Sequence, residues 1–265
     1  MSYRKDSLVI ERPEQLWRVD TRREFLRLLG IGGTIVMLPS VFAACGDDDN
    51  GTGPGPGPVS LNLSNDTGIL NYAFALEQLE AAFYIAVVAS AAFNGMSAEQ
   101  KEVFTDLRNH EVIHREFFRQ VLGNSRIPDL ELNQGTVSAS LASTASILQT
   151  SETFEDLGVA AYNGAGKYLT SADNLLVAGK IVSVEARHAA AIRDLREGLS
   201  LPGTPAGTRF AGDDVVNAQG LDVKLEPSAV LARVGASQFV STELEIGTGP
   251  TGTATADQGP PSPTP

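Results

Sequence analysis

The sequence predicts an all-α protein, an antiparallel four-helix bundle with one long crossover, followed by an irregular C-terminal extension. Three observations support this fold class. Apolar residues recur at helical spacing from residue 66 to residue 199. Capping patterns and glycines divide that stretch into four segments. A short, a long and a short connection join the segments, as expected for two helical hairpins linked by a crossover.

The four predicted helices are long enough for a bundle. They span about 66–94, 97–122, 142–169 and 171–199. The second opens with the capping-box pattern of Ser97 and Gln100 and ends before Gly123. The first and third connections are so short that they force antiparallel hairpins, whereas the link 123–141 is long enough to cross between the hairpins. At 1.5 Å per residue, each helix would be ~40 Å long.

The first 44 residues have the pattern of an export signal. Residues 21–26 resemble a twin-arginine signal, and the apolar run 28–44 that follows is short for a membrane span. Residues 42–45 resemble a lipobox, which implies that Cys45 becomes lipidated. We therefore expect export by the twin-arginine route and a lipid-anchored protein facing the periplasm or the cell exterior. A retained N-terminal anchor helix is the alternative.

Three further segments surround the predicted bundle. Residues 45–65 are rich in Gly and Pro and predict an extended tether. Residues 200–246 predict a C-terminal extension with one short helix near 226–234 and a strand or extended strap over 238–246. The Thr-, Gly- and Pro-rich residues 247–265 predict a disordered tail.

Composition excludes several classes of function. The net charge of −12 would repel phosphate backbones, so we expect no binding to nucleic acid. Cys45 is the one cysteine, which excludes an intrachain disulfide and a cysteine-rich zinc site. Any imidazole chemistry must come from His110, His114 and His188, the three histidines of the chain.

Charged residues lie on the apolar stripes of all four predicted helices. The second and fourth carry Glu-x-x-His pairs, and the first and third each carry a lone glutamate. These residues are Glu77, Glu111 with His114, Glu155, and Glu185 with His188. At 100° per residue each carboxylate faces the core, where an unpaired charge costs several kcal/mol. Two divalent cations would cancel four such charges, and the i, i+3 spacing lets the Glu and His of a pair reach one ion.

The same helices carry matched tyrosines. Tyr84 follows Glu77 by seven residues, and Tyr162 follows Glu155 by the same interval. Glu80 is a competing ligand on the first helix, and the repeated spacing favours Glu77. An oxygen-rich set with one imidazole per ion predicts two iron ions, or manganese, rather than structural zinc.

From these motifs the chain resembles ferritin-like proteins, particularly the exported group that includes desiccation-related proteins. The resemblance covers 66–199 and is most specific over 76–84 and 154–162. It implies a ferritin-like bundle in which Glu77 and Glu155 are terminal or bridging carboxylates. It also implies that Tyr84 and Tyr162 lie near the centre, where they could hydrogen-bond a ligand or donate an electron.

Simpler interpretations of the bundle and its tyrosines remain open. The bundle could be vestigial and bind little metal, and the tyrosines could serve only as packing. Residues 110–114 also match the H-E-x-x-H motif of zinc proteases, but His110 lies off the carboxylate stripe. We expect His110 to face solvent or to contact a metal ligand without binding the metal itself.

Two functions from different classes follow. The first is a dinuclear oxidase, ferroxidase or peroxide-handling stress protein that uses dioxygen or peroxide. The second is a non-catalytic stress-protection or surface interaction module. The sequence leaves open both the catalytic role and a homodimer.

Overall fold

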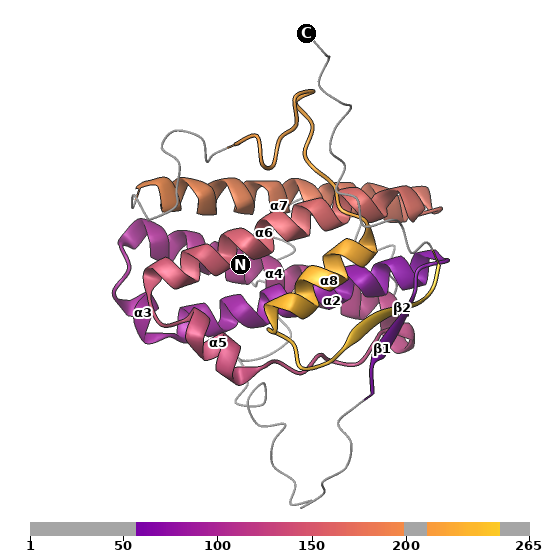
Figure 1. Cartoon of the computed structure of the whole chain (residues 1–265), viewed down its shortest axis with the longest axis horizontal. Coiled ribbons are helices and arrows are strands. Elements are labelled where there is room, and N and C mark those ends of the chain that lie inside the picture. Colours follow the sequence, from indigo (N-terminus) through magenta and orange to yellow (C-terminus); the bar gives the residue numbers. More distant parts are fainter. Residues whose placement is uncertain (1–56, 199–210, 250–265) are drawn as a thin grey trace, which may run out of the picture. The chain divides into compact units, whose positions relative to one another are not determined.

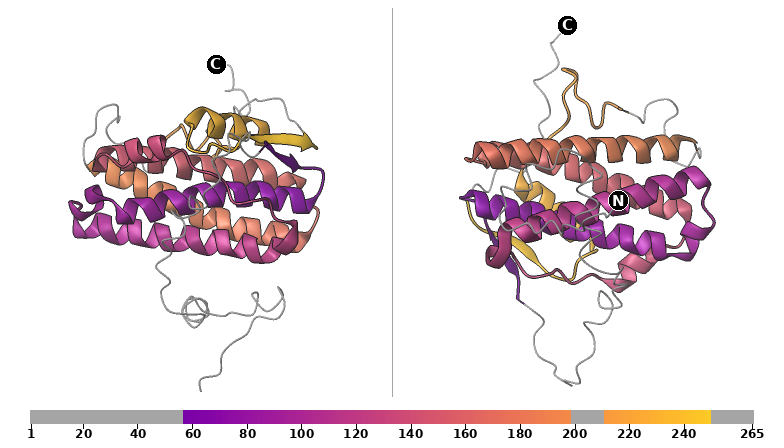
Figure 2. Two further views of the ribbon diagram at one scale, coloured as in Figure 1. Left: turned by 90° about the horizontal axis from the view of Figure 1, so that it is seen from below. Right: turned by 180° about the vertical axis from the view of Figure 1, so that it is seen from behind.

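Four long helices make up most of the folded part of the chain (Figure 1). The computed structural model describes residues 57–198 and 211–249. The long helices are α2 (Asp66–Ala89), α4 (Ala98–Leu122), α6 (Thr144–Ala165) and α7 (Ala172–Gly198). Helix α2 packs along α4, and α6 packs along α7. The two pairs meet through α2 with α6 and α4 with α7 (Figure 2). The predicted fold class is confirmed; the export signal and Cys45 lie outside the described residues.

Capping residues account for the helix boundaries. The Asn65 side chain accepts a hydrogen bond from the backbone of Gly68 at the start of α2, and the predicted Ser97–Gln100 capping box opens α4. The first helix was expected to continue to residue 94. It ends at Ala89 because Ser90 has an extended backbone (ψ 156°) and caps a separate short helix, α3 (Ala91–Asn94).

The crossover contains structure of its own. It begins with the 3₁₀ turn η3 (Gly123–Ser125) and includes helix α5 (Gln134–Ser140). The third long helix begins at Thr144 rather than near residue 142, because Ser143 forms a capping box with Ser146. It ends at Ala165 and is followed by the 3₁₀ turn η4 (Gly166–Tyr168).

Asp66 ties the start of α2 to the connection between α6 and α7. Its two carboxylate oxygens accept hydrogen bonds from the backbone and hydroxyl of Thr170, the backbone of Ser171 and the side chain of Asn174. These bonds lower the pKa of Asp66, although its limited burial acts in the opposite direction. One carboxylate therefore joins the ends of the two hairpins.

The C-terminal extension packs on the bundle. Helix α8 (Pro227–Ser237) contacts α6, and strand β2 (Leu244–Thr248) pairs in parallel with β1 (Val59–Asn62). Strand β1 lies within the segment expected to be a tether, and β2 extends past residue 246. Leu61 and Leu63 explain the difference, because both are 1% exposed and belong to the apolar core that α8 completes.

Helix α2 is long and apolar enough to cross a membrane on length and composition alone. However, 78% of that apolar stretch is buried inside the protein. Its apolar surface thus packs against the other helices, as in the central helix of a bundle.

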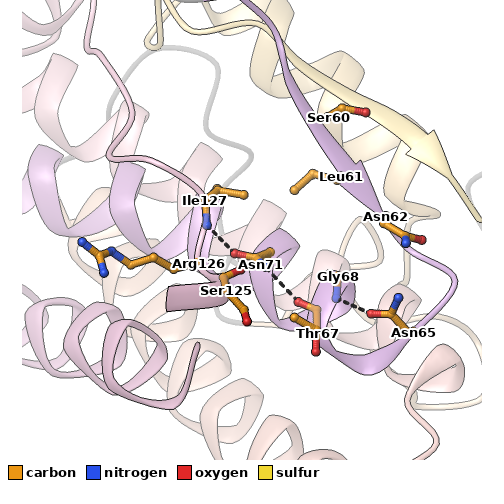
Figure 3. A pocket seen from close by; sticks show the side chains of 10 residues that line it. All are labelled: Ser60, Leu61, Asn62, Asn65, Thr67, Gly68, Asn71, Ser125, Arg126 and Ile127. Atoms are coloured by element: carbon orange, nitrogen blue, oxygen red, sulfur yellow. Dashed lines mark hydrogen bonds between the residues drawn. The ribbon is translucent and has the colours of Figure 1, made fainter. Parts of the chain in front are cut away.

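A hollow of about 400 Å³ lies between β1, the start of α2 and the beginning of the crossover (Figure 3). Asn71 lines it and joins its walls. The side chain accepts a hydrogen bond from the Ile127 backbone (2.7 Å) and donates to the carbonyls of Ser125 (2.9 Å) and Thr67 (3.1 Å). These three hydrogen bonds hold the start of α2 against the beginning of the crossover.

Candidate metal centre

The six predicted metal-site residues meet in the interior of the bundle, and each long helix contributes to the set. The four glutamates have 0% of their surface exposed, and the two histidines at most 8%. They are Glu77 on α2, Glu111 and His114 on α4, Glu155 on α6, and Glu185 and His188 on α7. The i, i+3 spacing places both members of each Glu–His pair on the inner face of one helix.

Four of these residues surround one point, and we call them the His114 group: Glu77, Glu111, His114 and Glu185. Nδ1 of His114 lies 2.9 Å from Glu185 Oε1, 3.4 Å from Glu77 Oε2 and 3.5 Å from Glu111 Oε2. One ligand atom from each residue lies within 4.8 Å of the others. The set therefore has the dimensions of a coordination shell.

The His188 group repeats this geometry. Nδ1 of His188 lies 2.8 Å from Glu111 Oε1, 3.4 Å from Glu155 Oε2 and 3.5 Å from Glu185 Oε2. Glu111 and Glu185 each give one oxygen to each group, and we call them the shared glutamates. Glu77 and Glu155 each belong to one group, and we call them the outer glutamates.

The hydrogen bonds that are missing show that these atoms suit metal ions. Across the six residues, eight buried atoms have no hydrogen-bond partner among the other described residues, and within the set the two Nδ1 atoms form ion pairs with the carboxylates. These atoms are Glu77 Oε2, both oxygens of Glu111 and of Glu185, Glu155 Oε2, and Nδ1 of His114 and His188. They divide into the two groups of four with none left over. Buried polar atoms normally have partners from the surrounding protein, so a convergent set whose members face only one another fits the needs of two cations.

The two remaining carboxylate oxygens are occupied by the tyrosines. Tyr84 donates its hydroxyl proton to Glu155 Oε1 (2.5 Å), and Tyr162 donates to Glu77 Oε1. Each tyrosine thus reaches the outer glutamate of the opposite hairpin, not the one that precedes it in sequence. The bonds orient each outer glutamate with its second oxygen toward its histidine.

Burial and charge divide the four carboxyls into two protonation classes. Burial raises the pKa of Glu77 and of Glu155 to about 8, against the opposing charges of the histidines. Burial acts on the shared glutamates too, but the two adjacent imidazoliums outweigh it and lower the pKa of Glu111 and of Glu185.

The histidines show the complementary effect. Burial alone would lower the pKa of His114 and of His188, but the surrounding carboxylates raise both well above the ordinary value. Two imidazoliums and two ionised shared glutamates then balance. Without metal, the centre is electrically neutral near pH 7.

Glu80 lies close to the centre and belongs to neither group. It is 3% exposed, and its Oε2 lacks a hydrogen-bond partner among the described residues. Burial and the nearby carboxylates raise its pKa well above 4.5. A Cβ at Gly158 would come within 3.0 Å of Glu80 Oε1, so the glycine makes room for this side chain. Of the two ligands considered on the first helix, the geometry favours Glu77.

His110 is the one site feature that the sequence left undefined. It lies outside both groups, so the zinc-protease arrangement gains no support. Its Nδ1 lies 2.9 Å from Nε2 of His188, and the two rings stack with an 8° interplanar angle. Burial and the neighbouring imidazoliums lower the pKa of His110 and favour its neutral form. Its separation of 78 residues from His188 hid this contact from pattern analysis.

Comparison with protein families agrees with this geometry. The family model described as the ferritin-like domain matches residues 65–198, half of the chain. The chain belongs to this ferritin-like domain family. Within the ferritin-like domain lie the long helices and the six clustered residues, whereas β1, α8 and β2 are outside the match. No curated protein matches the chain at a significant level.

Proposed function

We propose that this ferritin-like domain holds two metal ions, iron or manganese, and reacts them with dioxygen or peroxide. The observation that carries the proposal is the convergence of eight buried ligand atoms into two four-atom sets. Each set has three oxygens and one imidazole nitrogen, a combination that suits iron or manganese better than structural zinc. When bound, such ions would supply electrons to dioxygen or peroxide, either as a resident cofactor or as the protein's own substrate.

The protein's own residues would position these ions and handle protons. The shared glutamates would supply ligand atoms to both ions, and each outer glutamate would supply one to a single ion. Tyr84 and Tyr162 fix the outer glutamates through hydroxyl hydrogen bonds and lie close enough to exchange a proton with them. The buried apolar residues around the centre limit the access of water.

Metal loading and Fe(II) oxidation test this proposal. We expect the purified mature chain to bind two Fe(II) per chain without oxygen and to oxidise them when oxygen is admitted. Glu111→Ala and Glu185→Ala should lose both properties because each removes a shared ligand. Glu102→Ala, at an exposed position on the same helix as Glu111, is the matched control.

Two outcomes would contradict all or part of the proposal. Fewer than one metal ion per chain after loading would refute the two-metal centre. Two bound ions with no oxidation above background would favour the alternative, a non-catalytic stress-protection or surface interaction module stabilised by metal.

We further propose that the protein is exported by the twin-arginine route and is anchored to a membrane through a lipid on Cys45. The Arg22-Arg23 pair and residues 42–45 support this location. Cys45→Ser should abolish incorporation of labelled fatty acid and release the protein from membranes. Arg22→Lys combined with Arg23→Lys should retain the precursor inside the cell. Membrane attachment of the Cys45→Ser chain would instead support the retained anchor helix.

A further inference from the structure

The contact between His110 and His188 gives the two halves of the centre different surroundings. Nδ1 of His188 points into its group of carboxylates, and Nε2 on the other side of the ring faces Nδ1 of His110. The ring centroids are 5.1 Å apart and the rings are nearly parallel. His188 is therefore held by a hydrogen bond and by stacking on the side away from the carboxylates.

Within residues 57–198 and 211–249, the other half of the bundle shows no equivalent contact. The two Glu-x-x-His pairs correspond in position, and His110 directly precedes the first pair. Val184 precedes the second, and a valine side chain cannot form a hydrogen bond. Among the described residues, no hydrogen bond is recorded for Nε2 of His114. The internal repeat is thus broken at one position beside the centre.

We propose that His110 is a positioning residue that makes the His188 group the tighter of the two metal positions. When His188 donates its Nε2 proton to Nδ1 of His110, its own Nδ1 is left free to bind a metal ion, so this direction of the hydrogen bond is the one that supports ligation. Stacking also restricts rotation of the His188 ring. His114 has no such partner in the part of the chain that the structure describes, so ordering its ring costs its group more entropy when an ion binds. This inference rests on the proposed metal binding.

The size of the effect follows from comparable sites. Removing a partner that orients a metal-bound histidine typically weakens metal affinity by about 10–100-fold. We therefore expect His110→Ala to weaken one of two binding steps by about 10–100-fold and to leave the other unchanged. His110→Gln keeps a side-chain acceptor and should recover part of the loss. Val184→Ala changes the corresponding position of the other half and should leave both steps unchanged.

Anaerobic Mn(II) titration of the purified chain, followed by calorimetry, measures both steps without any turnover. A second pair of variants assigns the affected step. Adding His110→Ala to a His114→Ala chain should weaken the remaining ion by the full factor. Adding it to a His188→Ala chain should have no further effect, because the ring that it positions is gone.

The outcomes separate this inference from the proposed function. A wild-type chain that binds no Mn(II) or Fe(II) refutes the metal centre itself. A wild-type chain that binds two ions, with His110→Ala binding both equally well, refutes the role of His110 alone. Equal weakening of both steps in His110→Ala and His110→Gln also refutes it, because that result indicates general structural damage.

Discussion

Loading the centre with two divalent ions at neutral pH should release about four protons per chain. The outer glutamates, with pKa values of about 8, carry a proton near pH 7. The histidines carry one on each Nδ1, because their pKa values are raised by the surrounding carboxylates. All four of these protons occupy ligand positions and must leave, whereas the shared glutamates are already ionised.

Charge balance gives the physical reason for this number. Before loading, two imidazoliums offset two carboxylates. Afterwards, two divalent cations offset four carboxylates and the imidazoles are neutral. Four protons leave as four units of metal charge arrive, so the buried centre stays neutral and avoids the large cost of a net charge in the interior.

Calorimetry with Mn(II) in two buffers of different ionisation enthalpy measures the protons released. At pH 6.5 the count should be close to four, since groups with a pKa near 8 are almost fully protonated there. At pH 8.5 the count should be lower, because the outer glutamates, with pKa values of about 8, have mostly lost their protons. Glu102→Ala should give the wild-type counts. A count near two at both pH values would refute the reasoning, because it would mean that the outer glutamates ionise in the metal-free bundle.

Three further predictions concern stability. The melting temperature of the metal-free chain should fall as pH rises from about 5.5 to 8. In this range the native outer glutamates, Glu80 and the two histidines keep protons that the unfolded chain loses. Calorimetry of the metal-loaded chain should show this trend reversed or absent. Glu80→Gln should raise the free energy of unfolding of the metal-free chain at pH 7.5 by roughly 1–3 kcal/mol. A neutral amide avoids the free energy that is needed to protonate the buried carboxyl at this pH. Urea denaturation measures this, and a decrease would contradict it. Asp66→Ala should lower the free energy of unfolding by about 1–2 kcal/mol in the same assay. The loss is modest because water screens the hydrogen bonds of the Asp66 carboxylate. An unchanged midpoint would show that these bonds do not stabilise the fold.

Helical periodicity was sufficient to predict the bundle because its information is local. An apolar stripe, a capping residue and a short link each act over a few residues, and they fixed the long helices to within a few positions. The pairing of β1 with β2 was beyond this reasoning, because it joins strands about 180 residues apart in short, weakly patterned segments. The interruption at Ser90 was missed because a serine between alanines also fits a continuous helix.

The candidate site, too, combines features that one helix determines with features that depend on how the two hairpins pack. Inward-facing glutamates and histidines could be named because a charge on an apolar stripe is conspicuous in one helix at a time. Which oxygen faces which ion, and which tyrosine reaches which glutamate, depends on how two hairpins approach each other. Tyr84 was matched to Glu77 by spacing along one helix, whereas its hydroxyl reaches Glu155 on the other hairpin. The His110–His188 contact required the same non-local information.

The buried charges favour a metal centre over a bundle that serves only to present a surface. Replacing buried ionic groups by well-packed apolar side chains is often neutral or stabilising by about 1–4 kcal/mol, so a bundle needed only for its outer surface would have no reason to keep them. An interaction module would use exposed residues, yet the convergent ligand atoms of the six residues lie in the interior, where 0% of each of four glutamates is exposed. Their arrangement in two sets, with each outer carboxylate held by a tyrosine from the opposite hairpin, maintains a costly geometry instead of relieving it. A pair of bound cations removes that cost directly, and this is why the interior of the bundle, not its surface, carries the proposed function.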